Sequence, residues 1–446
     1  MGKTTLCLIR FRRIFLSKPV VLKNLFVAVL YFCLFMACNF ASAEKKKVVA
    51  EDSLQYYPPT PGPLDKQEFR RYYREISNFF DSTLLHTGFN GGILVAKNGA
   101  VVYEKYVGRI DLRKPDPITD STSMHVASTS KTFTAIAILR LVQEGKLSLT
   151  DTLNRFFPGF PYPGITVQML LSHRSGLPNY LYFMSNLKWG MVNGRWTHQF
   201  ATNKDVLQVM FDQKPPPAAK PNTRFSYCNT NFMLLALIIE KITGMPFPEY
   251  MQQKLFGPLQ MTHTYIFTLK DTATATPSFT GTGRYWDYDF LDGTYGDKNL
   301  YTTPQDMLKW DQALYTDQVI RPSLLDSAFT PYSLEKNTVH NYGLGWRLQL
   351  LPNGKKVIYH FGKWHGSNAA FARLTDEKAT IIIIGNRFNR NIYNTAHLAY
   401  DLFGDYMQHH GSNNDDDSPE SAAKSENSPG GDNRAAPLHK NKRHRR

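Results

Sequence analysis

The fold of this chain is restricted most by where its strand-like segments fall, at both ends of one long region. Residues 91–103 read as two apolar strands around Asn98-Gly99, a dipeptide typical of tight hairpin turns. Apolar stretches with helical period follow at 130–144 and 231–242. Strand-like segments return near the C-terminus, at 342–350, 369–374 and 380–384. Because strands at both ends enclose helices, we predict an α+β domain whose sheet joins the chain's two ends, with a helical insertion.

The N-terminus has the order of segments found in export signals. Residues 1–24 carry six lysines and arginines and no acid, an uncharged apolar run occupies 25–38, and an Ala-Ser-Ala site ends at Ala43. This order predicts a signal peptide at residues 1–43 and an exported, periplasmic or secreted protein. The apolar run of about 14 residues is short for a bilayer span, so a leader retained as a membrane anchor is one alternative. Lipidation of Cys38 is the other.

Cleavage of this leader changes the cysteine count and the charge. Three of the four cysteines leave with it and Cys228 remains, so we expect no intramolecular disulfide. Six of the 52 lysines and arginines leave and none of the 37 acids, so the net charge falls from +15 to +9. An excess of this size does not by itself indicate nucleic acid, and we predict no nucleic-acid partner.

Two polar segments flank the mixed region. Residues 44–64 are proline-rich near their end and are predicted to be a linker. Residues 409–446 are mostly small and polar and close in a basic run, a composition that cannot bury enough apolar surface to fold. We predict a disordered tail whose basic end touches an anionic envelope surface; a merely solvated tail is the alternative. Residues 65–408 are the predicted folded domain.

Several motifs that would indicate other chemistries do not occur in the sequence. His-Glu-x-x-His, paired Cys-x-x-Cys and phosphate-binding glycine loops are missing, so we predict no metal and no cofactor. Gly-x-Ser-x-Gly is missing as well, which argues against the nucleophile turn of α/β-hydrolases.

Ser128-Thr129-Ser130-Lys131 lies where an apolar segment gives way to a predicted helix. Residues three apart in a first helical turn share a face, so the amine of Lys131 can reach the hydroxyl of Ser128. A buried amine accepts a hydroxyl proton when desolvation lowers its pKa. Ser128 is therefore a candidate nucleophile and Lys131 a candidate base. Ser-x-x-Lys occurs five times, but only Ser128 stands at a strand-to-helix entry, where free backbone N–H groups can stabilise an oxyanion.

Tyr227-Cys228-Asn229 precedes the second predicted helix and is the only Tyr-x-Asn in the chain. A tyrosine near a lysine can relay a proton, and the amide of Asn229 can hold a substrate carbonyl or the lysine. The alternative is that Tyr227 is a packed aromatic residue and Asn229 a helix N-cap. Cys228, with no evident histidine partner, is interpreted as a small buried hydrophobe.

With these motifs the chain resembles the serine β-lactamase-related proteins of the class C type, a group that includes penicillin-binding DD-peptidases, D-amino-acid peptidases and esterases. The similarity covers about residues 80–400. Its further segments are GILVAKNG at 92–99, EGKLSL at 144–149, LLSHRSGLP at 170–178, YTTPQDM at 301–307 and YGLGW at 342–346. The resemblance implies a β-lactamase/DD-peptidase-like fold, with an antiparallel sheet built from both chain ends, flanking helices and a helical subdomain.

The family's third motif is Lys or His, a variable residue and Gly, on a strand facing the nucleophile. The string that begins at His86 precedes the nucleophile and breaks the family's order. The string that begins at His360 follows Tyr227 and continues with the family's His-x-Gly-x-x-x-Gly spacing, so we choose His360. By the same resemblance, Asn229, Gly362 and Lys363 bind substrate, and the N–H groups of Ser128 and Lys363 form the oxyanion hole.

The sequence also departs from the family pattern. Where β-lactamases carry a Thr or Ser hydroxyl that helps bind the lactam carboxylate, this chain has Phe361, which argues against efficient β-lactam turnover. Lys363, His365 and Arg373 are candidates to offer a cation instead, and solvent-facing side chains are the equal alternative. The family's glycine-rich run is altered to Gly-Asp-Lys-Asn at 296–299. His173 belongs, by resemblance, to a structural turn.

Residues and resemblance together predict acyl transfer. Ser128, activated by Lys131 with help from Tyr227, attacks a carbonyl, Tyr227 or His360 protonates the leaving group, and water releases the acyl-enzyme. We predict a serine hydrolase that cleaves an amide or ester, with a D-amino-acid peptide of DD-peptidase type or an ester as substrate. Peptidoglycan is the candidate source of the peptide. A true β-lactamase and a non-catalytic binding protein that uses the same cleft are the alternatives.

Overall fold

The computed structural model describes residues 62, 64–193, 195–317, 319–335 and 338–408. The predicted signal peptide, the lipidation site at Cys38, nearly all of the predicted linker and the predicted tail lie outside the described residues. The bounds of those segments and of the domain therefore stay predictions.

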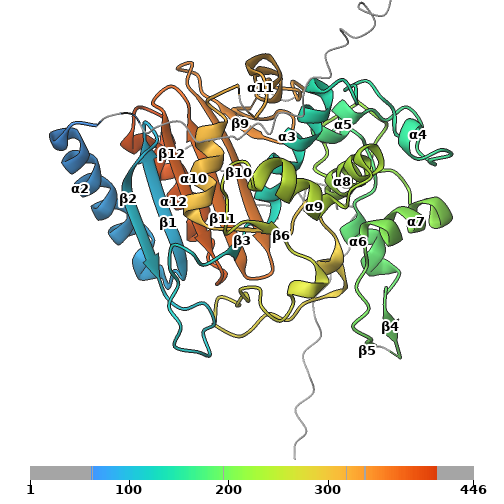
Figure 1. Ribbon diagram of the computed structural model, residues 1–446, viewed down its shortest axis with the longest axis horizontal. Helices are drawn as coiled ribbons and strands as arrows, with labels where there is room; N and C mark the ends of the chain where they lie inside the picture. Colours follow the sequence, from blue (N-terminus) through green and yellow to red (C-terminus); the bar gives the residue numbers. More distant parts are fainter. Residues whose placement is uncertain (1–61, 63, 194, 318, 336–337, 409–446) are drawn as a thin grey trace, which may run out of the picture. The chain divides into compact units, whose positions relative to one another are not determined.

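A seven-stranded antiparallel sheet forms the centre of the fold (Figure 1). Its first two strands, β1 (Gly91–Lys97) and β2 (Ala100–Val107), form the hairpin predicted around Asn98-Gly99, where both residues have positive φ. The order across the sheet is β2, β1, β12 (Ala379–Gly385), β11 (Ser367–Leu374), β10 (Lys356–Trp364), β9 (Arg347–Leu350) and β8 (His340–Tyr342). Because β1 pairs with β12, the sheet joins the two ends of the domain, and the predicted α+β class is confirmed.

The predicted strand at 342–350 is wrong in part, because the chain turns back within it. β8 ends at Tyr342, and β9 begins at Arg347 and pairs with β8. Gly345 in the turn has φ +84° and packs so closely on Ala135 that a Cβ atom would overlap that side chain. Two glycines in five residues therefore produce a hairpin where the apolar letters alone indicated one strand.

Helices cover both faces of the sheet, and alternate residues of each strand enter two separate cores. In β12, Ile381 and Ile383 face the core under α2 (Lys66–Thr83) and α12 (Asn391–Leu398). Ile382 and Ile384 face the larger core, which contains buried residues of α3 (Ser130–Gln143), α8 (Asn229–Thr243) and α10 (Pro304–Ala313). The two predicted helices are confirmed as α3 and α8; α8 begins two residues earlier than predicted.

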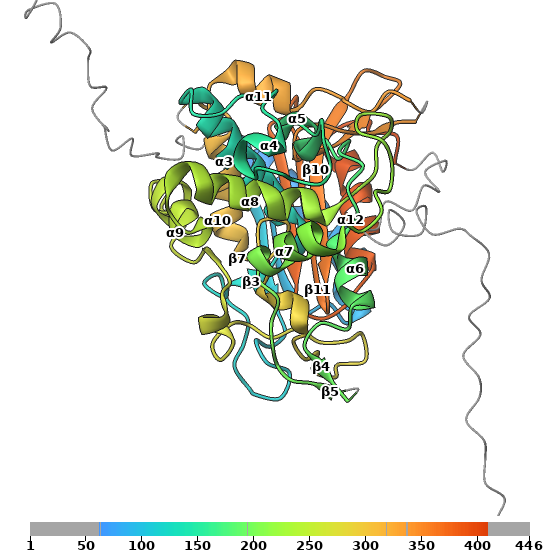
Figure 2. The same ribbon diagram turned by 90° about the vertical axis from the view of Figure 1, so that its right-hand side faces the viewer.

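The helical insertion lies on the far side of the sheet from α2 (Figures 1 and 2). It surrounds α8, which is buried along most of its length because nearly every residue of its interior is apolar. The surrounding elements are α4 (Leu153–Phe156), α5 (Val167–Leu171), α6 (Tyr180–Asn186), the hairpin of β4 (Met191–Val192) and β5 (Arg195–Trp196), α7 (Asn203–Gln213), α9 (Phe247–Met251) and η3 (Gln252–Phe256). The remaining helical elements are η1 (Leu85–Thr87), η4 (Leu269–Asp271), η5 (Phe290–Gly293), α11 (Pro322–Ala328) and η6 (Ala399–Leu402).

A small second sheet connects the insertion to the main sheet. It has three short strands in the order β3 (Met124–His125), β7 (Leu300–Thr302) and β6 (Tyr265–Ile266). β3 leads directly into η2 (Ala127–Thr129) and α3, so this sheet fixes the start of the central helix.

Within the described part of the chain, no single helix has the length and apolarity to cross a bilayer. α8 and the segment Phe247–Phe256 meet those criteria only as a pair, with a bend of 79° between them.

Candidate active site

Ser128 lies in the 3-10 turn η2, between β3 and α3, and its side chain is buried. The turn is tied to β7 by Ser130, whose hydroxyl donates to the carbonyl oxygen of Ala127 at 2.6 Å and accepts the N–H of Leu300 at 3.1 Å. Ala127 has φ +48°, a conformation that residues with a Cβ rarely adopt. The strained turn is thus held from the neighbouring strand, and it presents Ser128 at the start of α3.

Lys131 is fully buried, and its Nζ atom lies 3.0 Å from Oγ of Ser128. The same nitrogen contacts Oδ1 of Asn229 and the carbonyl oxygen of Asp297, each at 2.8 Å. Three acceptors match the three N–H bonds of an ammonium group. The structure therefore brings Ser128, Lys131 and Asn229 together as predicted, and it assigns Asn229 to the lysine. Asn229 is the first residue of α8, and its side chain is not the N-cap.

Tyr227 joins this group from the segment before α8. Its ring centroid lies 5.1 Å from Nζ of Lys131 and 5.5 Å from the guanidinium carbon of Arg347. On another side the ring packs on His173, with 4.3 Å between the centroids. Tyr227 is therefore both a packed aromatic residue and a neighbour of Lys131. The two alternatives that the sequence left open for this residue are compatible with each other.

His360 lies on β10, facing the larger core, and is fully buried. Its Nδ1 atom lies 2.7 Å from the carbonyl oxygen of Phe361, and its Nε2 atom lies 3.0 Å from the hydroxyl of Tyr342. The carbonyl can only accept, so these partners assign the proton to Nδ1 and make Nε2 the acceptor of the Tyr342 hydroxyl. Burial, with a smaller contribution from Tyr227, raises the pKa of Tyr342 well above its usual range. The ring centroids of His360 and Tyr227 are 6.4 Å apart, so His360 adjoins the site through Tyr227.

Gly362 brings the backbone of β10 against the turn that carries Ser128. A Cβ atom at this position would overlap the carbonyl oxygen of Val126 and lie 3.0 Å from the amide nitrogen of Ser128. Lys363 follows, paired with Asn368 of β11, and its ammonium lies 5.1 Å from the ring centroid of Phe388. Partial burial, and next the charge of Arg390, lower the pKa of Lys363. The predicted oxyanion donors, the N–H groups of Ser128 and Lys363, thus belong to two segments whose backbones are in contact at Gly362 and Val126.

The other candidates for a cation facing substrate are already engaged. Arg373 is buried and forms an ion pair with Asp311 at 2.5 Å, and Nε2 of His365 lies 3.0 Å from Asp292. Phe361 points into the core under α12, with 5.4 Å between its ring centroid and that of Tyr393. The variable residue of the third motif therefore faces away from Ser128. The presence of phenylalanine at position 361 is therefore weaker evidence against β-lactam turnover than the sequence alone indicated.

His173 occupies the structural turn that the resemblance implied. It has φ +54°, and its Nδ1 atom accepts the N–H of Cys228 at 3.1 Å. Burial, and then the charge of Lys131, hold the pKa of His173 well below its usual range. The thiol of Cys228 is buried and donates to the carbonyl of Leu177 at 3.4 Å, which fits a packed hydrophobe. The ring of His173 thus packs against the ring of Tyr227 and helps to hold it in place. The sequence did not indicate this role.

The sequence did not indicate Tyr342 as a neighbour of the site, and it gave no role to the altered run at 296–299. The carboxylate of Asp297 accepts the hydroxyl of Tyr180 at 2.8 Å, while its carbonyl binds Lys131. Nζ of Lys298 also donates to Tyr180 at 2.8 Å, and burial lowers the pKa of this lysine. The altered residues therefore form a buried polar network next to Lys131. The two charged residues Asp297 and Lys298, in a run that is glycine-rich in the family, were the signal that the sequence offered.

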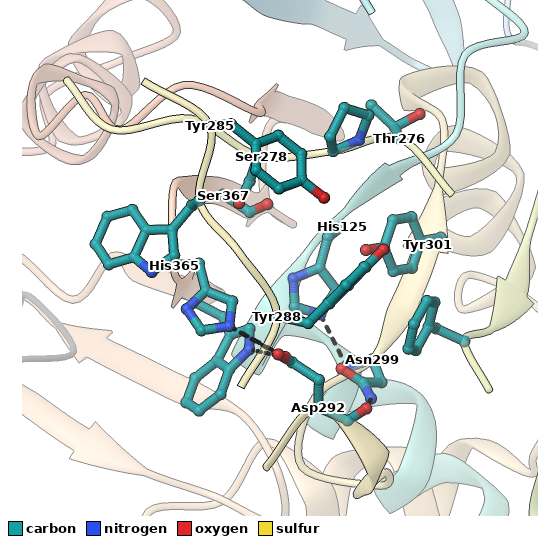
Figure 3. A pocket seen from close by; sticks show the side chains of 14 residues that line it. His125, Thr276, Ser278, Tyr285, Tyr288, Asp292, Asn299, Tyr301, His365 and Ser367 are labelled. Carbon is teal, nitrogen blue, oxygen red and sulfur yellow. Dashed lines mark hydrogen bonds and ion pairs between the residues drawn. The ribbon is translucent and has the colours of Figure 1, made fainter. Parts of the chain in front are cut away.

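A small hollow, with about 20 Å³ of space for water-sized molecules, lies at the turn between β10 and β11 (Figure 3). Asp292 and His365 meet at its edge. Together with Asp289 they form the one group of acid and histidine side chains in the described residues that could share a cation, with ligand-type atoms within 4.8 Å of one another.

The sheet, its helices and the serine–lysine pair at the start of α3 are the arrangement of a β-lactamase-like serine hydrolase. The profile of the Beta-lactamase family matches residues 81–403, and the chain belongs to this family.

Known relatives place the chain near the penicillin-binding proteins. Penicillin-binding protein 4* of Bacillus subtilis (strain 168) is 31% identical over 350 residues, which cover 74% of this chain and 75% of the relative. The octameric penicillin-binding protein homologue from Pyrococcus abyssi has a TM-score of 0.64 at 26% identity, over 74% of this chain and 77% of that one. D-amino acid amidase from Ochrobactrum anthropi SV3, complexed with L-phenylalanine, has a TM-score of 0.58 at 22% identity, over 70% and 91% of the two chains. The last likeness shows the fold alone.

Proposed function

We propose that this protein is an exported serine hydrolase that cleaves amide or ester bonds through an acyl-enzyme on Ser128. The observation that carries the proposal is the 3.0 Å contact between Nζ of Lys131 and Oγ of Ser128 in a buried site. The lysine is held by Asn229 and Asp297 from two other directions, so its nitrogen is already aimed at the hydroxyl. Such preorganisation lets one proton transfer activate the nucleophile.

The chemistry follows from these contacts. In its neutral form Lys131 accepts the proton of Ser128 as Oγ bonds to the substrate's carbonyl carbon. The resulting oxyanion lies at the contact between η2 and β10, where the N–H groups of Ser128 and Lys363 are the proposed donors. The bond to the leaving group then breaks, and the proton passes from Lys131 to the leaving nitrogen or oxygen with Tyr227 as the relay.

His360 acts in this scheme by positioning rather than by direct proton transfer. Both ring nitrogens of His360 have partners, Tyr342 and the carbonyl of Phe361, and the ring of Tyr227 neighbours both His360 and Lys131. We therefore assign leaving-group protonation to Tyr227, and we assign to His360 the electrostatic and steric support of that tyrosine. In the last step water attacks the acyl carbon, and Oγ of Ser128 recovers its proton.

The proposed substrates are peptides that contain D-amino acids, with esters as the second choice. This choice is supported by the similarity to penicillin-binding proteins and by the fold shared with a D-amino acid amidase. Peptidoglycan-derived peptides are the proposed natural source. The basic leader and its Ala-Ser-Ala site support export, and the basic end of the chain supports contact with an anionic envelope surface.

The test is intact-mass spectrometry of the purified protein after incubation with four reagents: a fluorophosphonate, a nitrophenyl ester, a D-alanyl-D-alanine peptide and a penicillin. Each reagent is also given to Ser128→Ala and to Ser185→Ala, a serine that likewise precedes a lysine by three residues but lies on an exposed part of α6. We expect covalent adducts in the wild type and in Ser185→Ala and none in Ser128→Ala.

The reagent turned over fastest identifies the substrate class, and fastest turnover of the penicillin would identify a β-lactamase. Adducts that persist in Ser128→Ala would refute the nucleophile. If no reagent reacts with the folded wild type, the cleft is that of a binding protein. The acyl-enzyme proposal is then wrong.

A further inference from the structure

The carbonyl group that holds Lys131 belongs to the peptide bond between Asp297 and Lys298. Its oxygen lies 2.8 Å from Nζ of Lys131, and the same nitrogen lies 3.0 Å from Oγ of Ser128. The direction of this carbonyl therefore helps to determine where the lysine nitrogen lies relative to the serine. Asp297 and Lys298 are charged residues that are only 1% and 3% exposed, so their side chains must find their partners inside the protein.

The side chains of Asp297 and Lys298 converge on one hydroxyl group, that of Tyr180. Oδ2 of Asp297 lies 2.8 Å from this hydroxyl, and Nζ of Lys298 also lies 2.8 Å from it. A carboxylate accepts hydrogen bonds and an ammonium group donates them, so the Tyr180 hydroxyl donates to Asp297 and accepts from Lys298. Two consecutive side chains are thus tied to one oxygen atom, and both ends of the peptide bond between them are held in place.

The peptide groups before and after this bond are held as well. The hydroxyl of Thr134, on α3, donates to the carbonyl oxygen of Gly296 at 2.7 Å. The N–H of Asn299 donates to Nε2 of His125 at 3.1 Å. The 297–298 peptide group therefore lies between two fixed neighbours and has little freedom to turn its carbonyl away from α3.

Tyr180 is anchored beside the other residue that holds the lysine. It is fully buried at the start of α6, and its N–H donates to Oγ1 of Thr230 at 2.8 Å. Thr230 directly follows Asn229, whose side chain contacts Nζ of Lys131 at 2.8 Å. The Tyr180 hydroxyl is therefore fixed relative to α8, and the two protein oxygens that hold Lys131 besides Ser128 share one support.

Lys298 also reaches the strand that carries the second proposed oxyanion donor. Its Nζ atom lies 4.8 Å from the ring centroid of Trp364, within the range of a cation–π contact, and donates to the carbonyl oxygen of Leu291 at 2.9 Å. Trp364 directly follows Lys363 on β10. One buried ammonium group thus contacts both the hydroxyl that fixes the 297–298 carbonyl and the strand that provides the N–H of Lys363.

We propose that Tyr180, Asp297 and Lys298 are positioning residues for acylation: they hold the 297–298 carbonyl, and through it the amine of Lys131, at the distance from Ser128 that proton transfer requires. The inference rests on the proposed function, because it assigns these residues to a reaction at Ser128. All three side chains are buried, so they act without touching substrate. A small displacement of the amine lowers the rate of proton transfer steeply and leaves substrate binding almost unchanged.

The first test is Tyr180→Phe, which keeps the buried ring and both charges and removes the shared hydroxyl. Stopped-flow kinetics of the first turnover of a nitrophenyl ester separate the acylation rate constant at saturation from the dissociation constant of the ester. We expect the rate constant to fall by at least about tenfold and the dissociation constant to stay within about twofold. Tyr162→Phe is the matched control, since it removes another buried hydroxyl, which donates to the carbonyl of Pro215 at 2.6 Å, and should change neither constant.

The second test asks whether the hydroxyl and the carboxylate act as one unit. Asp297→Asn retains an acceptor for the Tyr180 hydroxyl and should keep more of the acylation rate than Asp297→Ala. Tyr180→Phe combined with Asp297→Ala should be no slower than the slower of the two single variants, because both remove the same contact. Far-UV circular dichroism checks the fold of each variant. Asp297→Ala leaves the charge of Lys298 unopposed and could fail to fold, and Tyr180→Phe then decides alone.

The outcomes separate this inference from the proposed function. An acylation rate constant of Tyr180→Phe within about twofold of the wild-type value would overturn the positioning role, and so would a change confined to the dissociation constant. Losses that add in the double variant would also overturn it, because the two groups would then act separately. In each of these cases, wild-type hydrolysis that depends on Ser128 leaves the proposed function intact. A folded wild type without any Ser128-dependent reaction would overturn both.

Discussion

Gly362 and Val126 meet backbone to backbone, at a distance where a Cβ atom on residue 362 would overlap the carbonyl oxygen of Val126. The same Cβ atom would lie 3.0 Å from the amide nitrogen of Ser128. β10 and the turn that carries Ser128 can approach each other this closely only because residue 362 has no side chain. This contact places β10 beside Ser128 and makes the proposed oxyanion hole possible.

Gly362→Ala should accordingly damage catalysis more than stability. The methyl group must push β10 or the turn aside, and a displacement of about 1 Å in an active site can cost about 100-fold in rate. We expect kcat/KM to fall by at least that factor in steady-state ester hydrolysis. Gly281→Ala is the matched control, since a Cβ atom there meets its nearest atom at 3.4 Å and needs no unusual φ. Unchanged kcat/KM in Gly362→Ala would contradict the close approach.

A second prediction concerns the hydrogen bond between Tyr342 and His360. Tyr342→Phe keeps the ring that packs near Tyr227 but removes the donor to Nε2 of His360. If His360 positions Tyr227, the variant should lower kcat by about tenfold with little change in KM, because the lost interaction affects the proton relay more than binding. His360→Gln, which retains an acceptor for Tyr342, should recover more activity than His360→Phe. An equal loss in both His360 variants would show that the hydrogen bond plays no part.

The sequence was sufficient for the fold class and the central pair of residues. The Asn98-Gly99 turn, the helix that follows Ser128 and the apolar runs near the C-terminus are local signals, and each corresponds to an element of the structure. The Ser128–Lys131 contact is local as well, since three residues of helix bring the two side chains together. Choosing His360 over His86 needed the order of motifs in a family, because no local signal distinguishes the two strings.

What the sequence could not show depends on contacts between distant segments. Tyr342 reaches His360 only because β8 and β10 flank β9, and Asp297 reaches Lys131 across 166 residues. Arg373 looked like a candidate for binding a substrate carboxylate, yet burial and Asp311 determine its role. The residues that line the hollow extend from His125 to Ser367 along the chain, so no short window of sequence contains them.

The buried histidines make stability depend on pH. Burial lowers the pKa of His125 to about 3 and holds that of His173 well below its usual range. An unfolded histidine titrates near pH 6.5, so below that pH the unfolded chain binds protons that the folded chain does not. The stabilising contribution is therefore complete above about pH 6.5 and is lost as the pH falls toward 3, by about 1.4 kcal/mol per pH unit for each histidine.

His125→Gln tests this dependence and keeps the acceptor for the N–H of Asn299. Urea unfolding between pH 4 and pH 6 should give a slope of unfolding free energy against pH that is smaller than the wild-type slope by about 1.4 kcal/mol per unit. Far-UV circular dichroism at pH 7 checks that the variant folds. Parallel slopes in the two proteins would mean that His125 is protonated in the folded state over this range.

The buried ion pair of Arg373 and Asp311 gives the last prediction. Nε of Arg373 donates to Asp311 at 2.5 Å, and the hydroxyl of Thr380 donates to the other carboxylate oxygen at 2.5 Å, so the pair joins α10 to β11 and β12. Arg373→Met leaves a buried carboxylate without its cation and should lower the free energy of unfolding by about 3–5 kcal/mol in urea titrations. Arg373→Met combined with Asp311→Leu removes both charges and should recover most of that loss. Because Arg373 is buried and paired with Asp311, we expect it not to contact substrate. The double variant should therefore keep the wild-type KM for a carboxylate-bearing peptide. A KM raised tenfold or more in a stable double variant would instead restore Arg373 as a substrate-binding cation.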